Sequence, residues 1–478
     1  MIVEKSYRTL GGTLLAAGII LAGLLNVSTR AEAQSARPNI VVMMADNLGY
    51  GDVGAYGGSR APTPRIDALA REGIQLADFQ VEPNCTPSRA AFLTGRLPIR
   101  SGTSGLAAPG TKTGLAPGEI TLAELLREAG YSTALFGKWH LGESLERQPQ
   151  FQGFDEFWGI LTLITPASAE IPGYHPKFIR HQDVLQARRD QKPIITGKLS
   201  MEYRAEIDRD MTIKAKDYIA AQARTDKPFF LFVSFTNPHH PVLPHPDFKG
   251  KSGGGAYADV LMELDYNSGV ILDTIDKQGL RDNTIVVWIS DNGPTTYSEP
   301  DQNGDSGPWS GELGSAWEGG LRTAGMIRWP EKIESGRLSA DLFHILDFFP
   351  TIATFAQATI PNDRPIDGLD QSDFLLGKQA TSNRDHTIVF YNQKLTAVRW
   401  HQYKFLKVAH EKEHSILYPP TELPLPQIFN LRMDPKERHN LLGMKGYAPL
   451  LRQYYGLVGR YMQTLKAKNG RTGKKIRD

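Results

Sequence analysis

The chain has very little cysteine: Cys85 is the only one in 478 residues. A single thiol cannot form an intramolecular disulfide, and no second thiolate is available for a cysteine-based metal cluster. A chain of this length therefore depends on its hydrophobic core for stability, also in an oxidising compartment. Any role of Cys85 has to come from its neighbours in the sequence.

The chain also lacks an excess of charge of either sign. Its 54 Lys and Arg residues nearly balance its 52 Asp and Glu residues, which gives a formal net charge of +2. Nucleic acid and acidic membrane surfaces attract strongly basic proteins. The composition gives no reason to expect such partners, and we predict no nucleic-acid binding.

Long apolar runs are scarce, and the main one lies near the N-terminus. Lys5 and Arg8 precede an apolar stretch over residues 13–27, and Ala31-Glu32-Ala33 is a small-x-small cleavage site. The stretch is short for a transmembrane helix, which needs about 20 residues. The pattern predicts a cleaved signal peptide over residues 1–33, with an uncleaved N-terminal anchor as the alternative. We expect an exported protein, periplasmic or secreted, without a stable membrane anchor.

Four segments have the pattern of buried strands, and helical patterns lie between them. The strands are predicted over residues 39–45, 131–136, 229–235 and 284–290. The helices are predicted over residues 64–72, 122–129 and 257–278, each followed by a glycine that can end it. Apolar strands that alternate with helices predict an α/β fold, with a large, mostly parallel sheet between helices.

Beyond about residue 365 the pattern changes to shorter strands and a terminal helix. The strands are predicted over residues 387–391, 395–400, 403–406 and 427–431, and the helix over residues 448–466. This predicts a small C-terminal α+β domain with an antiparallel sheet over residues 365–478. It would follow the α/β domain over residues 34–364.

Polar residues follow each of the four long strands. They are Asp46-Asn47, Lys138 with His140, His239-His240, and Asp291-Asn292. In a parallel sheet the ligand crevice lies beyond the carboxyl ends of the strands. These side chains should therefore meet at one edge of the sheet and form a functional site.

Asp46, Asn47, Asp291 and Asn292 are candidate metal ligands. Their carboxylate and amide oxygens suit Ca²⁺ or Mg²⁺, whereas zinc would prefer imidazole or thiolate. Asp-Asn pairs followed by glycine are also ordinary turn sequences. Two such pairs at two strand ends, in a chain that also holds Cys85, favour the metal site.

Cys85 precedes a predicted helix. Pro87 favours the first turn, and residues 88–94 continue the helix as far as Gly95. Cys85 would lie at the helix N-terminus, where free N–H groups favour negative charge. Arg89, four residues on, would share its face and offer a planar fork of donors to an anion, although an arginine there can also be purely structural.

Lys138, His140, His239 and His240 are the remaining candidates. Lys138 and His140 point to the same side if the chain is still extended there. His239 and His240 point to opposite sides, so at most one of them is expected to face the site. A single histidine after a strand is commonly a loop residue, but several at one sheet edge favour a functional role.

These residues resemble the motifs of the type I, formylglycine-dependent sulfatase family over most of the mature chain. The segments that carry the resemblance are Ala45-Asp46-Asn47-Leu48-Gly49-Tyr50-Gly51-Asp52, Cys85-Thr86-Pro87-Ser88-Arg89 with Thr94-Gly95-Arg96, Gly137-Lys138-Trp139-His140-Leu141-Gly142, Pro238-His239-His240-Pro241, Asp291-Asn292-Gly293-Pro294 and Trp317-Glu318-Gly319-Gly320-Leu321-Arg322.

The resemblance implies an arylsulfatase-like sulfuric ester hydrolase with the alkaline-phosphatase-like fold. A formylglycine-generating enzyme would oxidise Cys85 to formylglycine, whose hydrate attacks the sulfate ester. The products would be an alcohol and inorganic sulfate, formed through a covalent sulfo-formylglycine intermediate. The substrate would be a sulfated small molecule or glycan, and no part of the sequence specifies its alcohol.

The resemblance also assigns the site residues. The implied metal is Ca²⁺, with Mg²⁺ as the alternative, and its ligands would be Asp46, Asn47, the modified Cys85, Asp291 and Asn292. The implied catalytic residues are Cys85, Arg89, Lys138, His140 and His239. In this assignment His239 protonates the departing alcohol, and His140 takes the proton that allows sulfate to leave.

Two positions differ from the usual pattern of the family. Asn47 stands where a second aspartate is common, and Leu313 stands where a sulfate-contacting lysine is usual, four residues before Trp317. The two changes together leave the net charge the same, and we hypothesise that one loss offsets the other. Leu313 also keeps open a phosphodiesterase or phosphonate monoester hydrolase on the same fold. A non-catalytic protein that binds sulfated glycans is a further alternative.

Overall fold

The computed structural model describes residues 37–162, 182–296, 300–409, 411 and 420–466. Residues 39–478 belong to one compact unit. The signal peptide predicted over residues 1–33 lies outside the described residues. Within the described ranges, no helix is both long enough and apolar enough to cross a membrane.

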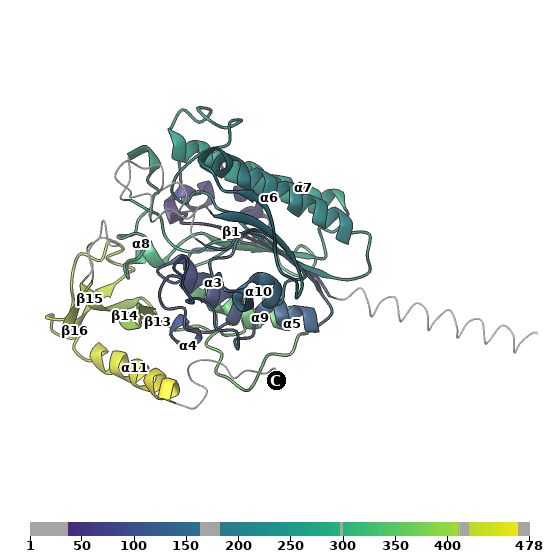
Figure 1. Cartoon of the computed structure of the whole chain (residues 1–478). Coiled ribbons are helices and arrows are strands. Elements are labelled where there is room, and N and C mark those ends of the chain that lie inside the picture. Colours follow the sequence, from purple (N-terminus) through teal and green to yellow (C-terminus); the bar gives the residue numbers. More distant parts are fainter. Residues whose placement is uncertain (1–36, 163–181, 297–299, 410, 412–419, 467–478) are drawn as a thin grey trace, which may run out of the picture. The chain divides into compact units, whose positions relative to one another are not determined.

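A ten-stranded sheet forms the centre of the fold, in the order β11-β2-β10-β9-β1-β8-β4-β5-β6-β7 (Figure 1). Its middle strands run parallel to one another. They are β9 (Thr284–Ser290), β1 (Asn39–Ala45), β8 (Phe229–Ser234), β4 (Ser132–Lys138) and β5 (Glu156–Ile160). Four of these are the strands predicted from the sequence, so the predicted fold class is confirmed.

The two edges of the sheet were not predicted. They consist of β2 (Ile74–Leu76), β10 (Gly325–Arg328), β11 (Arg337–Ser339), β6 (Asp183–Arg188) and β7 (Ile194–Lys198). All of their pairings are antiparallel except that of β11 with β2. These strands are short or partly exposed, and they lack the continuous apolar run that marks a strand buried on both faces.

Helices cover both faces of the sheet (Figure 1). One face carries α2 (Pro64–Arg71), α6 (Met201–Gln222) and α7 (Ala256–Lys277). The other carries α3 (Cys85–Thr94), α5 (Leu122–Glu128), α9 (Phe348–Phe355) and α10 (Ser372–Leu375). The short helices α4 (Pro98–Ser101) and α8 (Glu318–Leu321) complete this part of the chain, together with a small pair of strands, β3 (Phe79–Gln80) and β12 (Phe343–His344).

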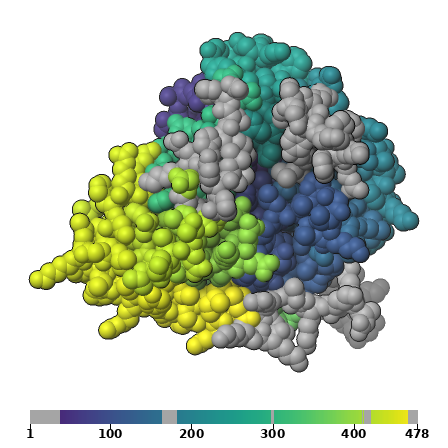
Figure 2. Space-filling model, turned by 60° about the vertical axis from the view of Figure 1, so that its left-hand side comes forward, coloured from purple at the N-terminus to yellow at the C-terminus, as the bar shows by residue number. Residues whose placement is uncertain are grey.

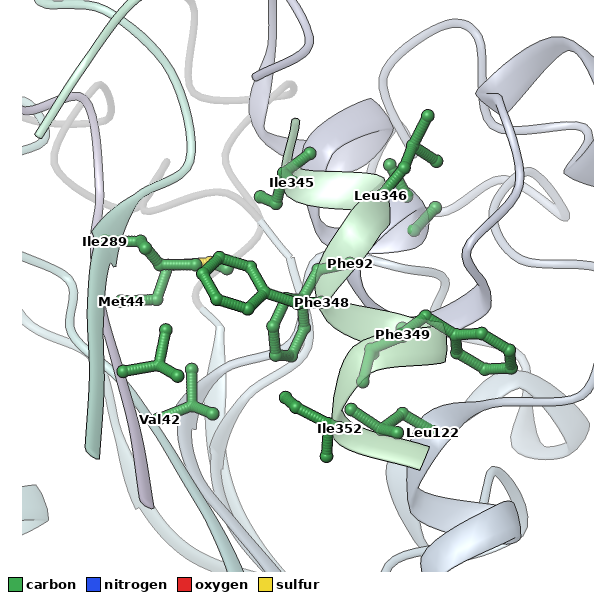
Figure 3. Packing of buried hydrophobic residues seen from close by; sticks show 14 of the residues in the cluster. Val42, Met44, Phe92, Leu122, Ile289, Ile345, Leu346, Phe348, Phe349 and Ile352 are labelled. Carbon is green, nitrogen blue, oxygen red and sulfur yellow. The ribbon is translucent and has the colours of Figure 1, made fainter. Parts of the chain in front are cut away.

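Successive residues of β1 enter different hydrophobic cores because strand side chains alternate between the two faces. Val42 belongs to the core beneath α3 and α9, and Val41 belongs to the core beneath α6 and α7. Figure 3 shows the first core, in which Phe348 of α9 and Phe92 of α3 lie together beside the strands. The Phe92 and Phe348 ring centroids are 6.0 Å apart. Since both faces are apolar, polar side chains can enter only where a strand ends.

The C-terminal part is a four-stranded antiparallel sheet with one helix packed on it. The strands are β13 (His386–Tyr391), β14 (Lys394–Trp400), β15 (Tyr403–Ala409) and β16 (Thr421–Asn430), and the helix is α11 (Leu450–Lys466). The predicted small antiparallel sheet is therefore confirmed, whereas the domain boundary between residues 364 and 365 stays a prediction. In Figure 2 the yellow C-terminal surface directly adjoins the surface of the preceding part of the chain.

A group of buried charges joins the two sheets. This interface cluster consists of Asp78, Glu318, Arg322, Arg399, Lys404 and Glu437. Lys404 of β15 places its Nζ 3.1 Å from Glu318 Oε1 and 3.0 Å from Glu437 Oε1. Burial alone would raise the pKa of Glu318, but Lys404, Arg322 and Arg399 hold that pKa far below its usual value.

Candidate active site

The ends of the parallel strands bring the predicted site residues together. Strands β1 and β9 are neighbours in register up to Ala45 and Ser290, so Asp46 and Asp291 leave the sheet side by side. The backbone N–H of Asp291 donates to the Ala45 carbonyl at 3.2 Å. The N–H of Asp46 donates to the Asn237 carbonyl, 3.0 Å away in the loop after β8. Three strand ends thus share one edge, as predicted.

Two buried acids and two buried cations form the centre of the site. Lys138 Nζ donates to Asp46 Oδ2 at 2.5 Å. Arg89 donates to Asp291 Oδ2 through Nε at 3.0 Å and through Nη2 at 2.7 Å. None of these four side chains is more than 1 % exposed. Charged side chains buried to this extent need partners of opposite charge. Here two negative and two positive charges balance one another.

The surroundings of Arg89 show how α3 is fixed to the sheet. Its Nη1 donates to the Lys138 carbonyl at 3.0 Å and to Ser234 Oγ at 2.5 Å. Burial acts to lower the pKa of Arg89, but the carboxylates of Asp291 and Asp46 outweigh it and raise that pKa. Burial and the neighbouring Asp46 raise the pKa of Asp291, against the opposing effect of Arg89 and Lys138.

Cys85 is the first residue of α3, after Asn84 in extended conformation. Its Sγ lies 3.6 Å from Asp46 Oδ1 and 3.6 Å from Asn47 Oδ1, and the residue is 2 % exposed. Burial raises the pKa of the thiol well above its usual value, and the cation of Lys138 opposes this only in part. The predicted place of Cys85, at the start of a helix that also carries Arg89, agrees with the structure.

His239 is the histidine of the His-His pair that lies beside the cysteine. Asp46, Cys85 and His239 each offer one ligand atom, and these atoms lie within 4.8 Å of one another. His239 Nδ1 lies 2.6 Å from the His240 carbonyl. A carbonyl only accepts, so Nδ1 carries the hydrogen and Nε2 is the nitrogen free for chemistry. Burial and Lys138 hold the pKa of His239 well below its usual value.

His140 is buried beside the same cations, although its backbone is not extended. Its φ is 57°, so the alternation assumed for Lys138 and His140 ends before this residue. Its carbonyl accepts a hydrogen bond from Thr86 Oγ1 at 2.9 Å, next to Cys85 on α3. Neither ring nitrogen has a hydrogen-bond partner among the described residues. Burial, Lys138 and Arg89 lower the pKa of His140 far below its usual value, which favours the neutral ring.

The oxygen donors fit a hard divalent cation. Asn292 Oδ1 is buried without a hydrogen-bond partner in the described part of the chain, while Asn292 Nδ2 donates to Asn47 Oδ1 at 2.7 Å. Together with the Asp46 and Asp291 carboxylates, these amide oxygens form the donor set that Ca²⁺ and Mg²⁺ prefer. An acceptor without a partner in such a set is a position that a bound cation would satisfy.

Of the two unusual residues, Asn47 belongs to this donor set and Leu313 packs beside it. Asn47 has φ 66°, a conformation that asparagine tolerates better than most residues, and its Nδ2 donates to Thr295 Oγ1 at 3.3 Å. The N–H of Leu313 donates to the Pro294 carbonyl at 2.8 Å, three residues after Asp291, and Leu313 is 4 % exposed. Leu313 is therefore buried against the loop that carries two of the oxygen donors.

Several residues at the site were not predicted. The Ser234 hydroxyl accepts a hydrogen bond from Arg89, and the Thr295 hydroxyl accepts one from Asn47. Two charged residues of α6, Arg204 and Asp208, form hydrogen bonds with the loop that carries His239. Ser234 ends a strand, and that position was the available signal. Arg204 and Asp208 look like an ordinary helical i, i+4 pair in the sequence, so their role required the structure.

Comparison with known proteins agrees with this geometry. Residues 38–358 match the Sulfatase family, and residues 315–461 match the C-terminal region of N-sulphoglucosamine sulphohydrolase. The fold and the matched residues define a sulfuric ester hydrolase. The chain belongs to the sulfatase family.

Similar proteins cover nearly the same length. Human arylsulfatase A is 35 % identical, over 85 % of this chain and 83 % of its own. Human steryl-sulfatase is 33 % identical, over 78 % of this chain and 75 % of its own. The crystal structure of PsFucS1 sulfatase from Pseudoalteromonas sp. superposes with a TM-score of 0.84 at 30 % identity, covering 94 % of both chains.

Proposed function

We propose that the protein cleaves its sulfate ester through formylglycine, formed from Cys85 after translation. The observation that carries the proposal is the position of Cys85, buried at the start of α3 within 3.6 Å of the Asp46 and Asn47 oxygens. The hydrate of formylglycine has two hydroxyl groups, whereas the cysteine side chain has a single thiol. One hydroxyl attacks sulfur, and the second later allows the sulfate to leave, so a covalent intermediate can be resolved.

Arg89 and Lys138 stabilise charge on the transferred sulfuryl group. Both cations are already oriented by Asp291 and Asp46, so little reorganisation is needed when negative charge builds up on sulfate oxygens. The four charges cancel in the resting site. A bound divalent cation would leave the site with a net positive charge, which suits an anionic ester.

His239 and His140 carry the proton transfers. The His240 carbonyl holds Nδ1 of His239, so Nε2 is the nitrogen that faces the reacting groups. The negative charge of a bound sulfate ester favours the protonated ring, which then delivers a proton from Nε2 to the departing alkoxide. His140, with both ring nitrogens free among the described residues, accepts the proton of the second hydroxyl. Loss of that proton breaks the ester bond between residue 85 and sulfate, releases inorganic sulfate and regenerates the aldehyde, which water then hydrates.

We further propose Ca²⁺, with Mg²⁺ as the alternative, as the cation held by Asp46, Asn47, the modified residue 85, Asp291 and Asn292. Bound there, it would supply Lewis-acid stabilisation of the nucleophilic oxygen and of the sulfate. The oxygen-only protein ligands and the unpartnered Asn292 Oδ1 support this assignment.

The proposed substrate is a sulfated small molecule or a sulfated glycan. Among similar proteins, human steryl-sulfatase is named for a small molecule. Canine N-acetylgalactosamine-6-sulfatase, 34 % identical over 90 % of this chain, is named for a sugar. We also propose that the chain is exported by its N-terminal signal peptide to the periplasm or beyond, and that it meets a formylglycine-generating enzyme during maturation.

A substrate comparison tests the proposed reaction. Initial rates are measured on an aryl sulfate, a matched aryl phosphate diester and an aryl phosphonate, with inorganic sulfate quantified for the first. We expect the sulfate to be the preferred substrate, and Cys85→Ala to be inactive on all three. A clear preference for the diester or the phosphonate would instead support a phosphodiesterase or a phosphonate monoester hydrolase, the alternative suggested by Leu313. A correctly folded, metal-loaded protein inactive on every sulfate ester would support a sulfated-glycan binder.

A further inference from the structure

The loop that carries His239 is held from behind by α6. It follows β8 and contains Thr236 and Asn237, which are 0 % and 1 % exposed. Arg204 and Asp208, one turn apart on α6, are each 1 % exposed and both contact this loop. Neither residue belongs to the reaction described above, so two buried charges remain without a function.

Arg204 contacts the carbonyl side of the loop. Its Nη2 donates to the Thr236 carbonyl at 3.3 Å, to Asn237 Oδ1 at 3.0 Å and to the His239 carbonyl at 3.0 Å. Its Nε and Nη1 have no hydrogen-bond partner within the described residues. The hydrogen bonds of this guanidinium group therefore go to the His239 loop.

Asp208 contacts the N–H side of the same loop. Its Oδ1 accepts the Thr236 N–H at 3.0 Å and the Thr236 hydroxyl at 2.7 Å, and its Oδ2 accepts the Asn237 N–H at 3.0 Å. The aspartate thus fixes Thr236 and Asn237, the second and third residues after β8. Arg204 fixes the end of the turn, at His239 itself.

We infer that Arg204 and Asp208 are positioning residues that set His239 for proton transfer to the leaving group. A buried charge is costly, and both of these charges direct their hydrogen bonds to the loop that carries His239. The charges are aimed at the carbonyl of His239 and at the two residues that precede its Pro238. A misplacement of about 1 Å at a proton donor is enough to cost about 10²-fold in rate.

This inference rests on the proposed role of His239, and the leaving group supplies a specific test. A general acid matters most when the departing alcohol is a poor leaving group, and matters little for a nitrophenolate. We would measure kcat and KM on a series of aryl and alkyl sulfates with rising leaving-group pKa. The proteins are the wild type, Arg204→Gln, Arg204→Lys, Asp208→Asn and His239→Gln.

We expect Arg204→Gln to lower kcat by about 10- to 100-fold on the poorest leaving groups and by much less on the best ones, with KM nearly unchanged. His239→Gln should show the same trend more strongly. Adding Arg204→Gln to His239→Gln should cause no further loss, because both changes remove one function. Arg204→Lys should recover part of the rate because it keeps the charge.

Arg328→Gln is the matched control. Arg328 is also a buried arginine, 1 % exposed, but it pairs with Glu72 away from the His239 loop. This variant should lower thermal stability without changing the dependence of kcat on the leaving group. If Arg204→Gln lowers all rates equally, or changes only stability as Arg328→Gln does, the positioning role is wrong.

A spectroscopic measurement separates this inference from the proposed function. The hydrogen bond from His239 Nδ1 should give a downfield ring N–H resonance that disappears in His239→Gln. We expect Arg204→Gln to shift or broaden that resonance. An unchanged resonance contradicts the positioning role even if the protein is a sulfatase. A wild type that cleaves no sulfate ester in the series contradicts the proposed function and, with it, the role of His239.

Discussion

The molecule holds two buried clusters of charge that look alike in composition and differ in how completely they are bonded. The site has Asp46 and Asp291 against Arg89 and Lys138, and the interface cluster has three acids against three cations. Glu318 accepts from Arg322, Arg399 and Lys404, and these cations hold its pKa far below the usual value. In the site, burial and Asp46 instead raise the pKa of Asp291.

The difference teaches how to distinguish a structural cluster from a functional one. At the interface the central carboxylate is saturated by its own chain. At the site, the His140 ring nitrogens and Asn292 Oδ1 are buried without hydrogen-bond partners in the described chain. Since buried polar groups are nearly always bonded, unpartnered groups that lie beside the Asp46 and Asp291 carboxylates suit a ligand or a reacting group. Substitutions in the site should therefore lower activity, whereas substitutions in the interface cluster should lower stability.

The largest effect is expected from Cys85→Ala. The change removes the nucleophile and should lower kcat on the order of 10⁴-fold or more, while thermal unfolding stays close to that of the wild type. Cys85→Ser should be nearly as inactive unless the host oxidises serine at this position. Turnover of Cys85→Ala near the wild-type rate would show that the site works without residue 85.

Metal removal is the next test of the site. A strong calcium chelator should abolish turnover, and Ca²⁺ or Mg²⁺ should restore it. Asp291→Asn keeps the shape of the side chain but removes a charged donor, so it should weaken metal binding and lower activity in parallel. Full activity of the chelated protein in metal-free buffer would mean that the two Asp-Asn pairs are only turns.

Lys404→Met tests the interface cluster. Breaking a buried ion pair leaves charge uncompensated and should lower the free energy of unfolding by about 3–5 kcal/mol, with kcat little changed. Lys407→Met on the same strand is the matched control. Lys407 is 20 % exposed and pairs with an exposed Glu422, so its loss should cost only about 0–1 kcal/mol. Equal losses in a urea titration of both variants would contradict the distinction.

The same cluster predicts a direction for acid sensitivity. The folded-state pKa of Glu318 is depressed, so its contribution to stability is fully present above the unfolded value, about 4.3. That contribution is lost as pH falls from there toward the folded pKa. We expect Glu318→Gln to be less stable than the wild type at neutral pH and the gap to narrow in acid. A gap that widens as pH falls would reverse the assigned sign.

The smallest effect is expected from the two unusual residues. We assume that the negative charge lost at Asn47 and the positive charge lost at Leu313 offset one another. Asn47→Asp alone should then depress turnover by adding negative charge near an anionic substrate. Leu313→Lys alone should tighten sulfate binding without raising turnover. The double variant should recover more than the singles predict, with a coupling of about 0.5–3 kcal/mol in kcat/KM. An additive cycle would show that the two positions act independently.

Much of the fold could be predicted because its central strands are buried on both faces. The predicted bounds of β1 and β9 agree with the structure, and those of β4 and β8 differ by one or two residues. The edge strands could not be predicted because they are short and are defined by their partners. β2, for example, has three residues and is paired with β10 and β11, which come more than 200 residues later in the chain.

The site could be predicted where a residue ends a strand, directly follows one or begins a helix. Asp46, Lys138, Asp291 and Cys85 are such residues, and the structure brings them together. The contact of Arg204 with the His239 carbonyl joins a helix to a loop 35 residues away, and no local pattern records it. Similarly, the φ of 57° at His140 is invisible in a sequence pattern that assumes extended chain.

The most direct test of the central claim is the mass of the peptide that contains residue 85, taken from an active preparation. If the site works as proposed, active protein carries formylglycine at this position, and the aldehyde can be trapped by a hydrazide reagent. Its fraction should rise and fall with specific activity between preparations. A preparation that turns over a sulfate ester at full rate with only the unmodified Cys85 thiol would contradict the account.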